Sequence, residues 1–191
     1  MDDSTTVWAL VGLATVALMI IVIVASRHRA RTRRAELRSK FGPEYDRAVE
    51  EYGPDQADRE LASRERRVQK LQPRELSAAD RARFMASWAS IQQQFVDDPG
   101  VAVSGANELI NQLMRALGYR TEHFEQRVAD LSVDHASVVQ HYRAARALAD
   151  ANRNGQVNTE ELRQAVVHYR VLFADLLHEP KAETELRRAH A

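Results

Sequence analysis

The sequence lacks cysteine altogether and contains few glycines, prolines and aromatic residues. Because there is no thiol, the chain can form no disulfide bond, no thiolate zinc site and no cysteine nucleophile. Only 7 glycines and 5 prolines occur among 191 residues, which argues against a β-rich or low-complexity chain and favours long helices. No stretch alternates between apolar and polar residues with the period of two that is typical of a surface strand. These absences predict an all-α protein.

The sequence also lacks the short motifs that mark common enzyme sites. It contains no nucleophile elbow, no phosphate-binding P-loop and no dinucleotide-binding glycine fingerprint. No Glu-x-x-His pair is repeated, as a di-iron helix bundle would require. We therefore expect that the protein is not an enzyme and that it uses no cofactor, with calcium as the one alternative.

The charges balance overall but are unevenly placed. The 27 cationic and 27 acidic side chains give a formal net charge of zero. Seven of the cations lie in residues 27–40, which begin with Arg27 and end with Lys40 and contain a single acid. The rest of the chain, 41–191, is mildly acidic. A short basic segment beside an acidic body is not the composition of a nucleic-acid-binding domain, so we expect no nucleic-acid partner.

Residues 7–25 form a run of 19 residues without a charge. As an α-helix this run would be about 28 Å long, close to the ~30 Å hydrocarbon core of a bilayer. Trp8 lies at one edge, where an indole ring prefers the headgroup region. The alternative is a cleaved signal peptide, but that would begin with a basic region, and here Asp2 and Asp3 come first. The sequence therefore predicts a transmembrane helix over 7–25.

The cations after this run predict its orientation. Lysine and arginine favour the cytoplasmic side of a span, and none precedes residue 7. We therefore expect residues 1–6 to be extracytoplasmic and the bulk of the chain to be cytoplasmic, at a bacterial inner membrane. The cations of residues 27–40 can also adsorb to anionic lipid headgroups, at about 1 kcal/mol for each cation near the surface. The alternative is that they serve only as the topology signal.

Two similar motifs follow the basic segment. The letters FGPE at 41–44 return as YGPD at 52–55. Glycine readily ends a helix, and proline with an acidic residue readily begins the next one. We therefore expect a basic juxtamembrane helix over 26–41 and a charged helical spacer over 42–76, which together form a stalk.

The globular part is expected at 77–177. Ser77 and Asp80 resemble a capping box at the start of a helix. The helix that follows carries four large apolar side chains at spacings of four, three and four, on one face: Phe84, Trp88, Ile91 and Phe95. Such a stripe can belong to a cofactor site, although core packing is the commoner cause. Further periodic segments separated by turns predict a C-terminal bundle of about five helices, followed by a polar tail at 178–191.

Residues 150–161 resemble the calcium loop of an EF-hand. Oxygen-bearing side chains occupy loop positions 1, 3, 5 and 9, glycine occupies position 6, and glutamate occupies position 12. The resemblance implies six calcium ligands, one of them through its backbone carbonyl (Gln156): Asp150, Asn152, Asn154, Gln156, Asn158 and Glu161.

A helix hairpin explains the same letters without a metal. Asn154-Gly155 is a typical turn, and Asn158 with Glu161 three residues later forms a capping box. Only two of the six implied ligands are charged, and no second loop occurs, although EF-hands normally pair. We therefore favour the hairpin and keep low-affinity calcium binding as the alternative.

The two helices of this expected hairpin carry similar segments with a histidine at the same place. His141 lies thirteen residues before Asn154, and His168 lies thirteen residues after Gly155. In an antiparallel hairpin the two rings should therefore lie at the same height. A facing pair of imidazoles could bind a metal or respond to pH, whereas two half-buried histidines with separate partners are more usual.

Taken together, the anchor, the basic segment, the FGPEYDRAV segment at 41–49, the LSVDH segment at 131–135 and the HYR segment at 168–170 resemble a group of bacterial single-pass membrane proteins. That group has no established activity, so the resemblance implies the architecture alone. We expect a membrane-tethered helical bundle that acts as an interaction or scaffolding module for an unidentified protein partner.

Overall fold

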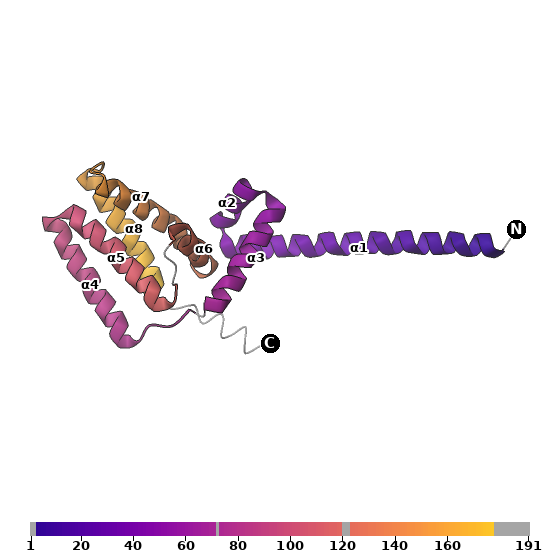
Figure 1. Ribbon diagram of the computed structural model, residues 1–191, viewed down its shortest axis with the longest axis horizontal. Helices are drawn as coiled ribbons and strands as arrows, with labels where there is room; N and C mark the ends of the chain where they lie inside the picture. The colour runs from indigo at the N-terminus through magenta and orange to yellow at the C-terminus, as the bar shows by residue number, and fades with distance from the viewer. Residues whose placement is uncertain (1–2, 72, 120–122, 178–191) are drawn as a thin grey trace. The chain divides into compact units, whose positions relative to one another are not determined.

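The structure is a computed structural model that describes the backbone of residues 3–71, 73–119 and 123–177. It describes the side chains of the same residues except 3–12 and 14–17. Within these ranges every regular element is helical, with eight α-helices and one 3-10 turn (Figure 1). The predicted all-α fold is therefore confirmed. The predicted polar tail at 178–191 lies outside the described residues.

The chain divides into two compact units, Met1–Lys40 and Phe41–Ala191. The first unit is formed by helix α1, Asp3–Phe41, whose last residue belongs to the second unit. The seven apolar side chains at 18–24 are between 42% and 65% exposed. Among the helices whose side chains are described, none is both long enough and apolar enough to cross a membrane.

The second unit begins with two helices, α2 (Pro43–Tyr52) and α3 (Pro54–Leu71). Gly42 and Gly53 precede them with φ values of 50° and 78°, a left-handed region that favours glycine. Each proline then begins a helix, where its missing N–H leaves no hydrogen bond unmade. The two helix junctions predicted from the repeated motif are thus confirmed. The helices pack on each other as a hairpin, and the Tyr45 hydroxyl donates to Asp58 at 3.2 Å.

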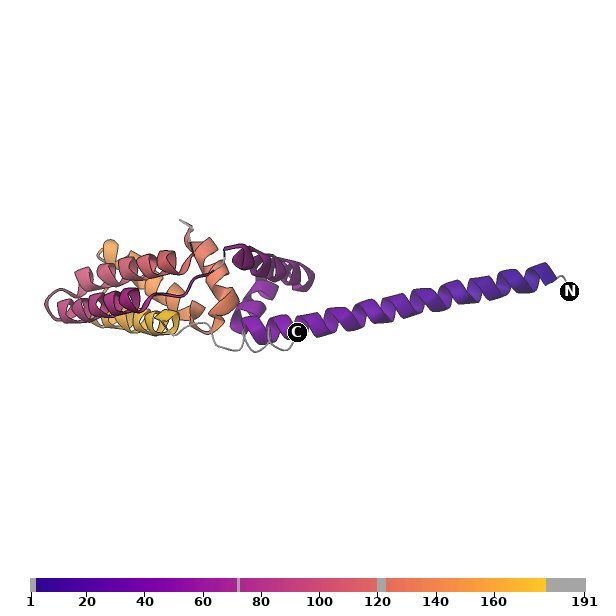
Figure 2. The same cartoon turned by 90° about the horizontal axis from the view of Figure 1, so that it is seen from below.

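Five further helices form the bundle: α4 (Ala78–Asp97), α5 (Pro99–Leu117), α6 (Phe124–Asp134), α7 (Val139–Arg153) and α8 (Thr159–Leu177). The 3-10 turn Ala136–Val138 joins α6 to α7. Helix α5 packs against α4, α7 and α8, as both views of the ribbon show (Figures 1 and 2). The core is therefore built around α5.

The aromatic stripe of α4 supplies one side of this core. Phe84, Trp88 and Ile91 are buried, whereas Phe95 near the helix end is half-buried. The Trp88 ring stacks on Phe173 of α8 with 4.9 Å between ring centroids. Packing against another helix thus explains the stripe without a cofactor.

Helix α3 packs against α6 of the bundle. The α2–α3 hairpin consequently belongs to the same compact unit as α4–α8, which differs from the expected separation of a spacer over 42–76 from a bundle over 77–177. The physical reason is that some charged side chains of α3 do not face solvent. Arg64 is only 8% exposed, and Arg67 pairs with the buried Asp130 of α6.

Candidate functional site

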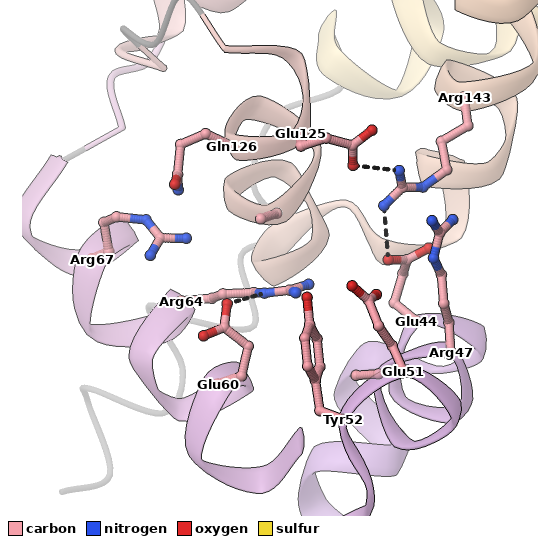
Figure 3. A pocket seen from close by; sticks show the side chains of 12 residues that line it. Glu44, Arg47, Glu51, Tyr52, Glu60, Arg64, Arg67, Glu125, Gln126 and Arg143 are labelled. Carbon is pink, nitrogen blue, oxygen red and sulfur yellow. Dashed lines mark hydrogen bonds and ion pairs between the residues drawn. The ribbon is translucent and has the colours of Figure 1, made fainter. Parts of the chain in front are cut away.

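A cavity of about 400 Å³ lies between the α2–α3 hairpin and helices α6 and α7 (Figure 3). Its lining is charged and contains little apolar surface. Tyr52, Gln126 and two alanines complete a wall of four glutamates and four arginines: Glu44, Glu51, Glu60, Glu125, Arg47, Arg64, Arg67 and Arg143. Charged groups gathered in a recess usually have partners, and several of these side chains form ion pairs.

Glu44 is the most deeply buried carboxylate of the wall, with 2% exposure. It is the second residue of α2, so it lies in the first helical turn, where the helix dipole favours a negative charge. Arg143 of α7 lies 3.5 Å from Glu44 and also pairs with Glu125 of α6 at 2.9 Å. Gln140 donates a further hydrogen bond to Glu44 at 3.4 Å. Arg143 therefore occupies two carboxylates at once (Figure 3).

A second buried pair joins α3 to α6 behind the cavity wall. Asp130 is 2% exposed and accepts a hydrogen bond from Arg67 Nε at 2.6 Å. Gln126 donates to the same carboxylate oxygen at 2.9 Å. Breaking such a pair by removing one partner leaves an uncompensated buried charge, which typically costs about 3–5 kcal/mol.

The other arginine N–H donors of the cavity wall have no acceptor among the described residues. Arg64 donates through Nε to Glu60 at 3.1 Å, and its two terminal amino groups make no hydrogen bond to any described residue. Arg67 likewise uses only Nε, and Arg47 has no ion-pair partner among the described residues. Figure 3 shows the guanidinium groups of Arg64 and Arg67 turned toward the space between α3 and α6, whereas that of Arg47 lies beside Glu44 and Arg143.

Tyr52 lies at the rim of the cavity beside Glu51 and is 38% exposed. A hydrogen bond to the Glu51 side chain raises the pKa of Tyr52, with a smaller contribution from burial. The phenol therefore stays protonated at neutral pH.

The residues of the EF-hand-like segment serve a helix hairpin in the structure. Asn158 N donates to Glu161 Oε2 at 2.8 Å, and Glu161 N donates back to Asn158 Oδ1 at 2.9 Å. These two bonds are the predicted capping box, which is confirmed. Gly155 has φ 66° in the turn, with Asn154 and Gln156 exposed beside it.

The other two implied calcium ligands also have partners elsewhere. Asp150 pairs with Arg146 at 3.0 Å and with Arg153. Asn152 turns its amide toward α5, where it donates to the Gly100 carbonyl at 2.9 Å. Across the described side chains, no three His, Asp or Glu residues are placed to hold one metal ion.

The two histidines lie at the same height, as the sequence predicted. The Nδ1 atoms of His141 and His168 are 2.9 Å apart, and the ring centroids are separated by 5.1 Å. The more usual alternative, in which each ring has a separate partner, is wrong. Burial lowers the pKa of His168, and the neighbouring His141 lowers it further.

No sequence motif marks a residue of the cavity wall as a functional candidate. Glu44 belongs to the FGPE motif of a helix junction, and Arg64 and Arg67 lie within the charged segment 42–76. Their partners lie up to about a hundred residues away along the chain, so no local spacing could reveal them.

Fold and cavity together define the chain as an all-α protein with a charged cavity in its larger unit. No protein-family model matches the chain, and neither a curated protein nor a solved structure matches it.

Proposed function

We propose that the chain is a membrane-tethered interaction module whose charged cavity receives part of a partner protein. The observation that carries the proposal is the set of unused guanidinium donors at the cavity, on Arg47, Arg64 and Arg67. Guanidinium donors that line a cavity and have no acceptor among the described residues are available to the acceptors of a ligand. The wall contains no serine, threonine or histidine among the residues that line it, so the proposal includes no catalytic step.

The tether in this proposal is residues 7–25. The support is the uncharged run itself, its place within the continuous helix α1, and the exposure of the apolar side chains at 18–24. An exposed apolar stretch of this kind is stable when lipid or protein covers it. The cations of 27–40 favour a cytoplasmic body at a bacterial inner membrane and contact with anionic headgroups.

The topology can be tested by adding protease to intact spheroplasts. Residues 27–191 should remain uncut until the membrane is permeabilised. Digestion of the helical body in intact spheroplasts would show that the cations of 27–40 do not set the orientation.

The interaction can be tested by placing a photo-crosslinking amino acid at the cavity rim in native membranes. Tyr52 is a suitable position because it lines the cavity and is 38% exposed. Val167 of α8 is a matched control, since it is 37% exposed and does not line the cavity. We expect a defined cross-linked protein from position 52 that is absent from position 167. No product from either position, or the same products from both, would refute the proposal.

A further inference from the structure

The cavity wall carries an imbalance between donors and acceptors that its net charge conceals. Four arginines face four glutamates, but Arg143 alone pairs with both Glu44 and Glu125. One guanidinium therefore satisfies two carboxylates. The other three arginines keep terminal amino groups that no described residue accepts from.

Arg64 is the most deeply buried of these three arginines. Its side chain is only 10% exposed, yet a single Nε–Glu60 bond is its one contact with an acceptor. A guanidinium carries five N–H donors. The free end of Arg64 points into the cavity, as Figure 3 shows, and its terminal amino groups are not among the buried polar atoms without a partner, so solvent reaches them there. They are therefore open to an acceptor of a ligand that replaces this water.

The geometry of the donors indicates the kind of acceptor. A planar guanidinium presents parallel N–H groups that match the two oxygens of a carboxylate or phosphate. Arg47 adds a cation without an ion-pair partner from α2, and Arg67 adds terminal amino groups from α3, held in place by its bond to Asp130. A neutral ligand would accept weaker hydrogen bonds from these donors than an ionised oxyanion does, and a cation would be repelled by them.

We propose that the cavity binds oxyanions, carboxylate or phosphate groups, through the terminal amino groups of Arg64, Arg67 and Arg47 that line it. The inference rests on the proposed function for the source of that group, which is an acidic segment of the partner protein. A free small ion is the other source of the same chemistry. Glu51 and Glu60 at the wall limit affinity for any anion, because they repel it.

The test measures binding to the full chain in detergent micelles by thermal shift and calorimetric titration. The probes are inorganic phosphate, succinate and a peptide of six glutamates. We expect the peptide to bind more tightly than either small ion. Arg47→Gln should weaken binding by about ten- to a hundredfold, the loss expected for hydrogen bonds to a charged group. Arg47 is exposed and has no ion-pair partner among the described residues, so this variant should fold normally.

Two further variants separate the cavity from nonspecific charge. Arg170→Gln removes an exposed arginine of α8 outside the cavity and should leave binding unchanged. Glu51→Gln removes a repelling carboxylate and should increase affinity severalfold. Because the cations of 27–40 are the same in all variants, their contribution cancels in the comparison.

The outcomes also separate this inference from the proposed function. Equal binding by wild type and Arg47→Gln, or no binding of any probe, would overturn the oxyanion site, while a cross-link at position 52 would still support the interaction. Tighter binding of phosphate or succinate than of the peptide, with no cross-link, would confirm the oxyanion chemistry and refute the partner protein as its source.

Discussion

The interaction energy between the His141 and His168 rings should change from favourable to unfavourable as the pH falls. A hydrogen bond between two Nδ1 atoms needs one ring to donate and the other to accept, so at least one ring is neutral when it forms. When both rings are protonated, neither can accept, and the two charges repel. The pair should therefore stabilise the α7–α8 hairpin at pH 8 and destabilise it at pH 5.

The size of each effect follows from the geometry. A net intramolecular hydrogen bond contributes about 0.5–1.5 kcal/mol. With ring centroids 5.1 Å apart, two unit charges repel by about 0.8 kcal/mol in water and by about 3 kcal/mol at an effective dielectric constant of 20. Both rings are partly exposed, so the lower figure is the better guide. The coupling energy should thus change from about 1 kcal/mol favourable to about 1 kcal/mol unfavourable.

The lowered pKa of His168 also makes the folded protein less stable in acid. Burial and the neighbouring His141 lower this pKa below the ordinary value of 6.5, so the unfolded chain binds a proton more readily than the folded chain. The stability contributed by the neutral ring is complete above pH 6.5 and is lost as the pH falls toward the folded pKa. For one proton the slope cannot exceed about 1.4 kcal/mol per pH unit.

A double-mutant cycle measures the coupling without the other titrating groups. Wild type, His141→Gln, His168→Gln and the double variant are unfolded in denaturant at pH 8 and at pH 5. The His135–Asp175 contact, at 2.6 Å, is present in all four proteins and cancels. A coupling energy with the same sign and size at both pH values would refute the reasoning.

Three further predictions concern the bundle and its borders. Trp88→Ala should cost about 3–5 kcal/mol in denaturant unfolding, because the 7% exposed ring stacks on Phe173; a loss under about 1 kcal/mol would contradict core packing. Glu161→Gln should be nearly neutral, since glutamine also serves in a capping box, and millimolar calcium should raise the melting temperature no more than magnesium does. A calcium-specific rise that is lost in this variant would support the EF-hand alternative. Arg67→Ala should cost about 3 kcal/mol in denaturant unfolding, because α3 still covers Asp130 and leaves its carboxylate buried without the cation; a loss under about 1 kcal/mol would show that the pair contributes little.

Much of the fold could be predicted because its determinants are local. The Gly-Pro junctions at 42–43 and 53–54 act within one turn of the chain, and the capping box of Asn158 and Glu161 spans three residues. The facing histidines could be predicted for a related reason. A tight turn at 154–155 sets the register of α7 against α8, so equal spacing from the turn means equal height.

The cavity could not be predicted, because it depends on contacts between distant segments. Helical periodicity indicates which face of α3 is apolar, but it does not reveal that Arg67 pairs with Asp130, 63 positions further along the chain. A charged helix face looks the same in sequence whether water or another helix covers it. The sequence around Arg64 therefore does not indicate that this side chain is buried.

The ion pairs explain why the interface between the α2–α3 hairpin and the bundle is polar. A hydrophobic interface between the α2–α3 hairpin and the bundle would be at least as stable, since buried ion pairs often gain little over apolar packing. The ion pairs instead fix the orientation of the side chains around the cavity. Arg143 pairs with both Glu44 and Glu125 and so offsets part of their repulsion of an anion, and Asp130 fixes the direction of Arg67. We infer that the polar junction holds the free donors of Arg64 and Arg67 in position before any ligand arrives, which lowers the entropic cost of binding.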